Sequence, residues 1–103
     1  GSALGPTGLK SRLKDVRAQL EPKAQPDFEV RLALVEEIGA LGYEHLGTDL
    51  TSPNAGVKAE AVATLSALRS RTADPQLKVR EAAALAVRKI EKKPEPKKEP
   101  EKK

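Results

Sequence analysis

The chain has no cysteine, tryptophan or methionine, and its 103 residues include one phenylalanine, one tyrosine and one histidine. Without cysteine there is no disulfide, no thiolate nucleophile and no cysteine-bound zinc. The compartment stays open on this basis, with the cytoplasm favoured. A core of leucine, valine and alanine suits close helix packing better than a deep ligand cavity.

Long apolar runs are also lacking. No stretch approaches the roughly 20 apolar residues of a membrane-spanning helix. No basic segment followed by an apolar one resembles a signal sequence. We therefore expect no membrane insertion.

The sequence also has few groups of side chains that could catalyse a reaction or bind a metal ion. A catalytic or metal-binding role for His45 would need partners, and the nearby Glu44 and Asp49 are too common an arrangement to indicate one. The neighbours Glu36 and Glu37 would point about 100° apart on a helix, so they cannot share a site as a carboxylate dyad does. We expect no catalytic residues, no metal and no cofactor, and therefore no enzyme activity from this chain alone.

The net charge of +4 is unevenly distributed. Residues 1–91 carry 13 Lys/Arg and 12 Asp/Glu, whereas residues 92–103 carry six lysines and three glutamates. Most of the basic excess therefore belongs to the C-terminal segment, whose prolines and lack of apolar residues predict a disordered tail.

The most regular stretch is 74–90. Asp74 is a capping residue, Pro75 suits a first helical turn, and the apolar positions 79, 83, 86, 87 and 90 follow helical spacing. The same frame of proline, three residues, valine and cation occurs at 26–31, 53–58 and 75–80. After the valine, apolar residues recur at equivalent positions in the three copies: 34, 61 and 83; 38, 65 and 87; and 41, 68 and 90. The chain is thus interpreted as a series of repeated helices.

This pattern resembles the second-helix signature of HEAT-type α-solenoids, over roughly residues 8–91. The resemblance implies an all-α fold of two antiparallel helical hairpins, 9–42 and 53–91, with four main helices stacked as HEAT-like repeats. The motif valines are spaced 27 and 22 residues apart, so an irregular four-helix bundle is the alternative. In this family the basic residue after the valine often pairs with a carboxylate of an adjacent repeat. That implies ion pairs for Arg31, Lys58 and Arg80, with Asp27, Glu60 or Asp74 as partners.

Four helices follow from the local pattern. Positions 9, 13, 16 and 20 form a narrow apolar stripe on a first helix that covers one edge of the core. Residues 26–41 are the most apolar and predict a central helix, in which Gly39 allows a close approach and Gly42 is a left-handed end residue. A phosphate-binding role for these two glycines is disfavoured, because they end a helix. Residues 43–52 predict a connector, and helices at 53–69 and 75–91 complete the set.

Three segments result: a disordered N-terminus at 1–7, in which Gly1 and Ser2 are typical of an expression scar; a helical-repeat domain at 8–91; and the tail at 92–103. The predicted function is a non-catalytic module for protein–protein interaction or scaffolding, with a monomer favoured. The alternative is weak binding of nucleic acid or another anionic partner through the last helix and the basic tail. The candidate partner-binding residues are Arg31, Glu37, Arg80, Arg88 and Lys89.

Overall fold

The structure is a computed structural model that describes residues 5–93, with side chains from residue 8 onward. Over this range the chain forms helices α1 (Gly5–Lys10), α2 (Leu13–Ala18), α3 (Phe28–His45), η1 (Gly47–Thr51), α4 (Ala55–Arg71) and α5 (Leu77–Glu91). No strand occurs within 5–93, which confirms the all-α prediction. Residues 1–4 and 94–103, where most of the predicted disorder falls, lie outside the described residues.

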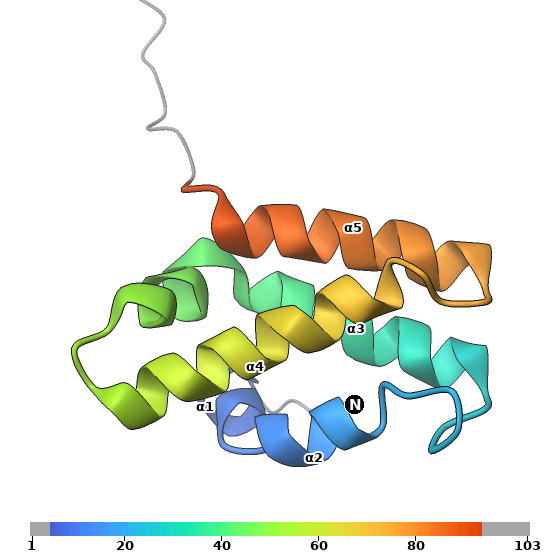
Figure 1. The fold of residues 1–103 in the computed structure, drawn as a ribbon, viewed down its shortest axis with the longest axis horizontal. Helices are drawn as coiled ribbons and strands as arrows, with labels where there is room; N and C mark the ends of the chain where they lie inside the picture. The colour runs from blue at the N-terminus through green and yellow to red at the C-terminus, as the bar shows by residue number, and fades with distance from the viewer. Residues whose placement is uncertain (1–4, 94–103) are drawn as a thin grey trace, which may run out of the picture.

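The helices are arranged around the pair α3 and α5, which lie side by side and run in the same direction (Figure 1). This pair makes the most extensive contact between any two elements. Helix α4 runs antiparallel to α5, packs against it and against η1, and contacts α2 on its other side. The core therefore lies between α3, α4 and α5, and the N-terminal helices cover one edge of it.

Two helices replace the single first helix that the sequence predicts. The break falls at Ser11 and Arg12, where the Ser11 hydroxyl donates a hydrogen bond of 2.8 Å to the carbonyl of Gly8. Helix α1 also begins at Gly5, within the segment expected to be disordered. The apolar stripe is nevertheless buried, because both short helices and the residues after α2 turn their apolar side chains inward; it consists of Leu9, Leu13, Val16 and Leu20.

The central helix ends where the sequence predicts. Asp27 caps its start by accepting a hydrogen bond of 2.9 Å from the backbone amide of Glu29. Gly42 has a φ of 63°, a left-handed conformation that favours glycine, and it interrupts the helix. One further turn follows and leads into η1, with Leu46 buried beneath it. The predicted connector is thus a short helical turn.

The third and fourth helices begin later than predicted. Asn54 caps α4 by accepting a hydrogen bond of 3.1 Å from the amide of Val57. Helix α5 begins at Leu77, and Asp74 lies before its N-cap residue, Gln76. Asp74 is therefore available for a different set of contacts, which are described below.

The three copies of the motif are equivalent only in part. Leu41, Leu68 and Ile90 are all buried, as the shared phase predicts. Of the motif valines, Val79 is fully buried, whereas Val30 and Val57 are exposed by 36% and 37%. The recurring pattern therefore gives similar helices that have unequal surroundings.

Gly39 allows α3 and α5 to approach closely. A Cβ atom added at this position would lie 2.8 Å from the Cβ of Ala86 and 3.2 Å from its Cα. Both values are shorter than an ordinary van der Waals contact, so even a methyl group would push the two helices apart. The predicted role of Gly39 in close packing is confirmed.

We expect the substitution Gly39→Ala to lower the free energy of unfolding by about 1 kcal/mol, because overpacking outweighs the better helix propensity of alanine. Adding Ala86→Gly removes the opposing methyl group. In urea denaturation the double variant should therefore lose less than the two single variants combined. Purely additive losses would contradict a direct contact.

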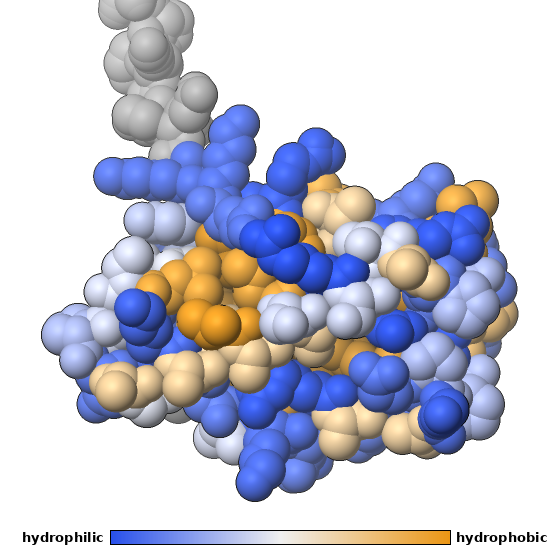
Figure 2. Space-filling view, viewed as in Figure 1, coloured by the Kyte–Doolittle hydropathy of each residue, from blue (hydrophilic) through white to orange (hydrophobic). Residues whose placement is uncertain are grey.

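The surface of the protein carries an apolar patch. Figure 2 shows apolar side chains gathered between α4 and the C-terminal half of α5, with hydrophilic side chains around them.

Within residues 5–93 no helix has both the length and the apolar character needed to cross a membrane.

Candidate functional site

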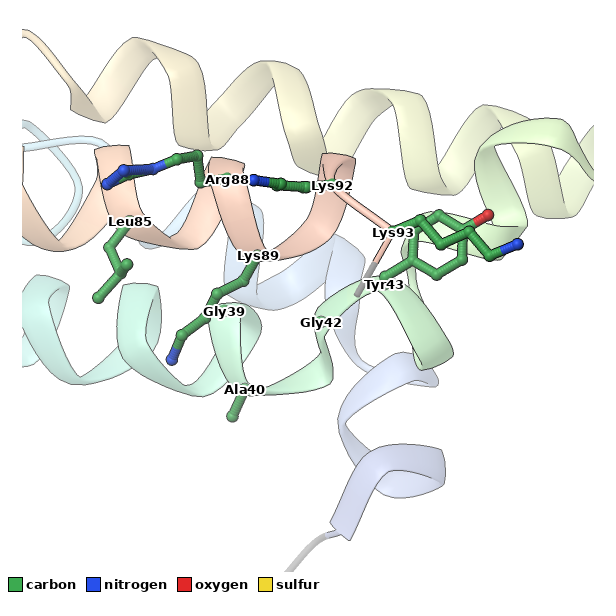
Figure 3. A pocket seen from close by; sticks show the side chains of 9 residues that line it. All are labelled: Gly39, Ala40, Gly42, Tyr43, Leu85, Arg88, Lys89, Lys92 and Lys93. Atoms are coloured by element: carbon green, nitrogen blue, oxygen red, sulfur yellow. The ribbon is translucent and has the colours of Figure 1, made fainter. Parts of the chain in front are cut away.

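A shallow groove lies between the C-terminal halves of α3 and α5. Its larger part is a hollow of about 650 Å³ (Figure 3), lined by Gly39, Ala40, Gly42, Tyr43, Leu85, Arg88, Lys89, Lys92 and Lys93. A smaller hollow of about 270 Å³ shares three of these residues and adds Glu36, Ala82 and Ala86. Because the two hollows share lining residues, we treat them as one site, the α3–α5 groove.

Small residues create this groove. Gly39 on α3 packs closely against Ala86 on α5, and the small residues Ala40 and Ala82 also line the groove, so the hollow lies at the surface above a close contact of the two helices. Leu85 projects beside this floor and is 48% exposed. The apolar lining of the groove is therefore accessible to a partner.

The end of the groove is shaped by the turn at Gly42. The helix stops there, and Tyr43 follows at the edge of the hollow (Figure 3). Lys92 and Lys93 come directly after α5 and line the same end. One aromatic ring and the final cations of the described chain thus lie together.

The groove is basic. The described residues that line its larger hollow include Arg88, Lys89, Lys92 and Lys93 and no acid. Glu36 is the one acid that lines the smaller hollow. None of the four cations forms a salt bridge to a side chain within residues 8–93.

The predicted site residues are not all brought together. Arg88 and Lys89 line the groove. Glu37 is exposed but does not line it, although its neighbour Glu36 does. Arg80 lies at the other end of α5, where its Nη1 donates a hydrogen bond of 2.8 Å to the carbonyl of Asp74.

Arg31 requires a correction, because it is buried and does not belong to an accessible face. Its Nε and Nη2 donate hydrogen bonds of 2.9 and 2.8 Å to the two carboxylate oxygens of Asp74. Its Nη1 donates a third, of 2.7 Å, to the carbonyl of Gln25. Asp74 was one of the partners that the resemblance implied, so this pairing is confirmed and the role in partner binding is withdrawn.

Asp74 is the centre of a buried ionic cluster. Besides Arg31, it accepts a hydrogen bond of 2.6 Å from Nη1 of Arg71 and one of 2.8 Å from the amide of Gln76. Burial raises the pKa of Asp74, but the hydrogen bonds from Arg31, Gln76 and Arg71 outweigh it and lower the pKa to about 2. The hydrogen bond to Asp74 likewise raises the pKa of Arg31. The cluster is therefore ionised at neutral pH, and it connects the start of α3 to the link between α4 and α5.

The remaining sequence candidates lie apart from the groove. His45 is exposed, and its Nε2 is 4.0 Å from a carboxylate oxygen of Glu44. Glu60, an implied partner of the motif cations, instead pairs with Arg17 of α2 at 2.6 Å. Within residues 5–93 no group of three or more histidine, aspartate or glutamate side chains is placed to hold a metal ion.

Sequence reasoning missed much of the groove. Tyr43 was assigned to a connector and Lys92 and Lys93 to the tail, because their proximity depends on how α3 meets α5. The cluster of basic residues at 88–93 was the sequence signal that could have identified the four cations of the groove. No local pattern identified Ala40 or Leu85.

No family model matches this chain, and comparisons with curated proteins and with solved structures found no match. The resemblance to HEAT-type solenoids therefore depends on the residues of the chain itself.

Proposed function

We propose that the chain is a non-catalytic helical-repeat module for protein–protein interaction, in which the α3–α5 groove receives a segment of another protein. The observation that carries this proposal is the groove itself, with an exposed leucine beside a floor of small residues and four cations without a salt bridge to a described side chain. Ligand contacts of this kind need no reactive group, and a shallow surface suits a protein segment better than a small molecule.

The proposal includes two stacked hairpins, as in HEAT-type repeats. The first is formed by α1, α2 and α3, and the second by α4 and α5. Two contacts support this stacking: α3 packs against α5, and α2 packs against α4. In such an arrangement the second helices of the two hairpins share one face. The groove would lie on that face.

A second candidate function is the binding of nucleic acid. It is favoured by the four cations at the end of α5, where α5 and the tail meet. Phosphate binding by these side chains predicts an affinity that falls steeply with salt, because each neutralised phosphate releases counterions. A binding constant measured at several salt concentrations therefore separates this function from an apolar contact.

Leu85 provides the test of the proposed function. We expect Leu85→Ser to weaken capture of the protein partner by about tenfold, because the exposed side chain loses its apolar contact. The matched control is Leu77→Ser, since Leu77 is on the same helix and 52% exposed but does not line the groove. Both substitutions should leave thermal stability nearly unchanged.

The measurement is capture from a lysate of the source organism on immobilised wild-type protein and on each variant. Proteins retained by the wild type and by Leu77→Ser, but not by Leu85→Ser, are the expected partners. Chemical-shift mapping with such a partner should then show changes at Ala40, Gly42 and Leu85. Equal capture by both variants, or shifts away from the groove, would overturn the proposed function.

A further inference from the structure

We infer that the segment held in the α3–α5 groove is an acidic peptide with an apolar anchor. The anchor packs against the exposed side chain of Leu85, and carboxylates beside it meet Lys89 and Lys92. This inference rests on the proposed function and specifies the chemistry of the partner.

The lining of the groove carries an excess of positive charge. Residues 88–93 contain four cations, and all four line the larger hollow. The one acid in this stretch, Glu91, forms a salt bridge with Arg69 of α4 and does not line the hollow. The four cations thus line the groove, whereas the one acid of this stretch pairs with a cation of α4.

The helix dipole explains only part of this arrangement. Cations in the last turn of a helix stabilise its negative end, which accounts for Arg88 and Lys89. Lys92 and Lys93 lie beyond the last helical residue, yet they line the same hollow. An anionic partner gives all four a common role.

An exposed apolar side chain lies beside these cations. Leu85 is 48% exposed and lines both hollows, next to the small residues Ala82 and Ala86. Gly39 and Ala86 are in close contact and leave no space between the helices, so a partner's aliphatic group would pack on the surface and bury Leu85. The partner therefore needs an apolar residue as well as carboxylates.

The acids near the other end of the groove favour a peptide over a polynucleotide. Glu36 lines the smaller hollow, and the exposed Glu81 is on the same helix as its alanines. A polynucleotide carries a phosphate at every step and would meet Glu36, whereas a peptide can place its acids at one end only. Base stacking needs aromatic side chains, and the groove offers Tyr43 alone. A peptide that carries its acidic residues at one end only therefore suits both the basic end of the groove and the end that contains Glu36.

The test is selection from a displayed library of random peptides on the immobilised full chain. We expect the retained peptides to be enriched in Asp and Glu next to Leu, Ile, Val or Phe. Retained peptides without an acidic excess would overturn the inference and leave the proposed function intact. A library from which no peptide is retained would overturn both.

Two charge-reversal variants of equal net charge test whether the peptide binds in the groove. The groove variant carries Lys89→Glu and Lys92→Glu, and the control carries Lys58→Glu and Lys78→Glu, which are exposed lysines outside the groove. Both variants have the same net charge. With a selected acidic peptide, the groove variant should bind at least about tenfold more weakly than the wild type. The control should change the affinity by less than about threefold.

An oligonucleotide is the competing probe. Single-stranded poly-dT should bind more weakly than the selected peptide, and the two charge-reversal variants should reduce its binding to a similar extent. Tighter binding of poly-dT than of every selected peptide, with a loss only in the groove variant, would overturn the inference in favour of nucleic acid. Equal peptide binding by the two variants would overturn it as well.

Discussion

Asp74→Asn is expected to lower the free energy of unfolding by about 3 to 5 kcal/mol at neutral pH. The side chain of Asp74 is fully buried and accepts hydrogen bonds from Arg31, Arg71 and the amide of Gln76. Asparagine has a similar shape, but it lacks the charge and has one acceptor oxygen. Two buried guanidinium groups would then lose their compensating charge. The expected loss of free energy is a large fraction of the total stability of a small domain.

The pH dependence gives a second measurement of the same cluster. The pKa of Asp74 is about 2 in the folded chain and 3.8 for an unperturbed group. Because the folded value is lowered, the ionised carboxylate stabilises the fold above about pH 4, and this contribution is lost as the pH falls towards 2. We expect the loss to be about 2 kcal/mol in the wild type. It should be missing in Asp74→Asn, so the two proteins become more alike in acid.

Urea denaturation followed by helical circular dichroism measures both effects. The control is Asp15→Asn, because Asp15 is an exposed acid on α2. That substitution should change the free energy of unfolding by less than about 0.5 kcal/mol. If Asp74→Asn were no more damaging than Asp15→Asn, the cluster would not hold the fold together.

Gly47→Ala is expected to cost about 3 kcal/mol, the second largest effect. A Cβ atom at Gly47 would overlap the carbonyl oxygen of Ile90 and lie 2.6 Å from Cδ1 of Tyr43. The carbonyl belongs to the backbone of α5, so it cannot move away without displacing the last turn of that helix. We therefore expect η1 to separate from α5 and to expose the buried Leu46.

Gly56→Ala is the matched control for this substitution. Gly56 is exposed in the first turn of α4, where the nearest atom to an added Cβ is Oδ1 of Asn54 at 3.3 Å. Alanine is the better helix former by about 1 kcal/mol, so this variant should be as stable as the wild type or slightly more so. Thermal melts of the two variants provide the comparison. Equal melting temperatures for Gly47→Ala and Gly56→Ala would show that η1 can move enough to accommodate a methyl group at Gly47.

The sequence predicted the helices because their signals are local. Periodicity and capping residues located the three long helices α3, α4 and α5 to within a few residues, and the two glycines of α3 had the roles expected of them. The break at Ser11 was missed because one continuous helix would bury the same stripe as two short ones. The unequal burial of Val30 and Val79 was missed because a motif does not specify which neighbour covers it.

The site was harder to predict because it depends on distant residues. The resemblance implied the pairing of Arg31 with Asp74, 43 positions away in the sequence, but Arg31 was also assigned to a partner-binding face, because its burial depends on how the helices pack. Arg88 and Lys89 were found because basic residues near a helix end are visible in the sequence itself. Tyr43 and Lys93 share a hollow only because α3 and α5 lie in parallel.

The broad contact between α3 and α5 also has a consequence for biosynthesis. The two helices are far apart in sequence, and α5 follows every other described helix. While the ribosome is still adding residues 77–91, the surface of α3 that α5 will cover has no partner. The core therefore stays incomplete until residues 77–91 have been translated, and until then the nascent chain presents aliphatic side chains that chaperones recognise.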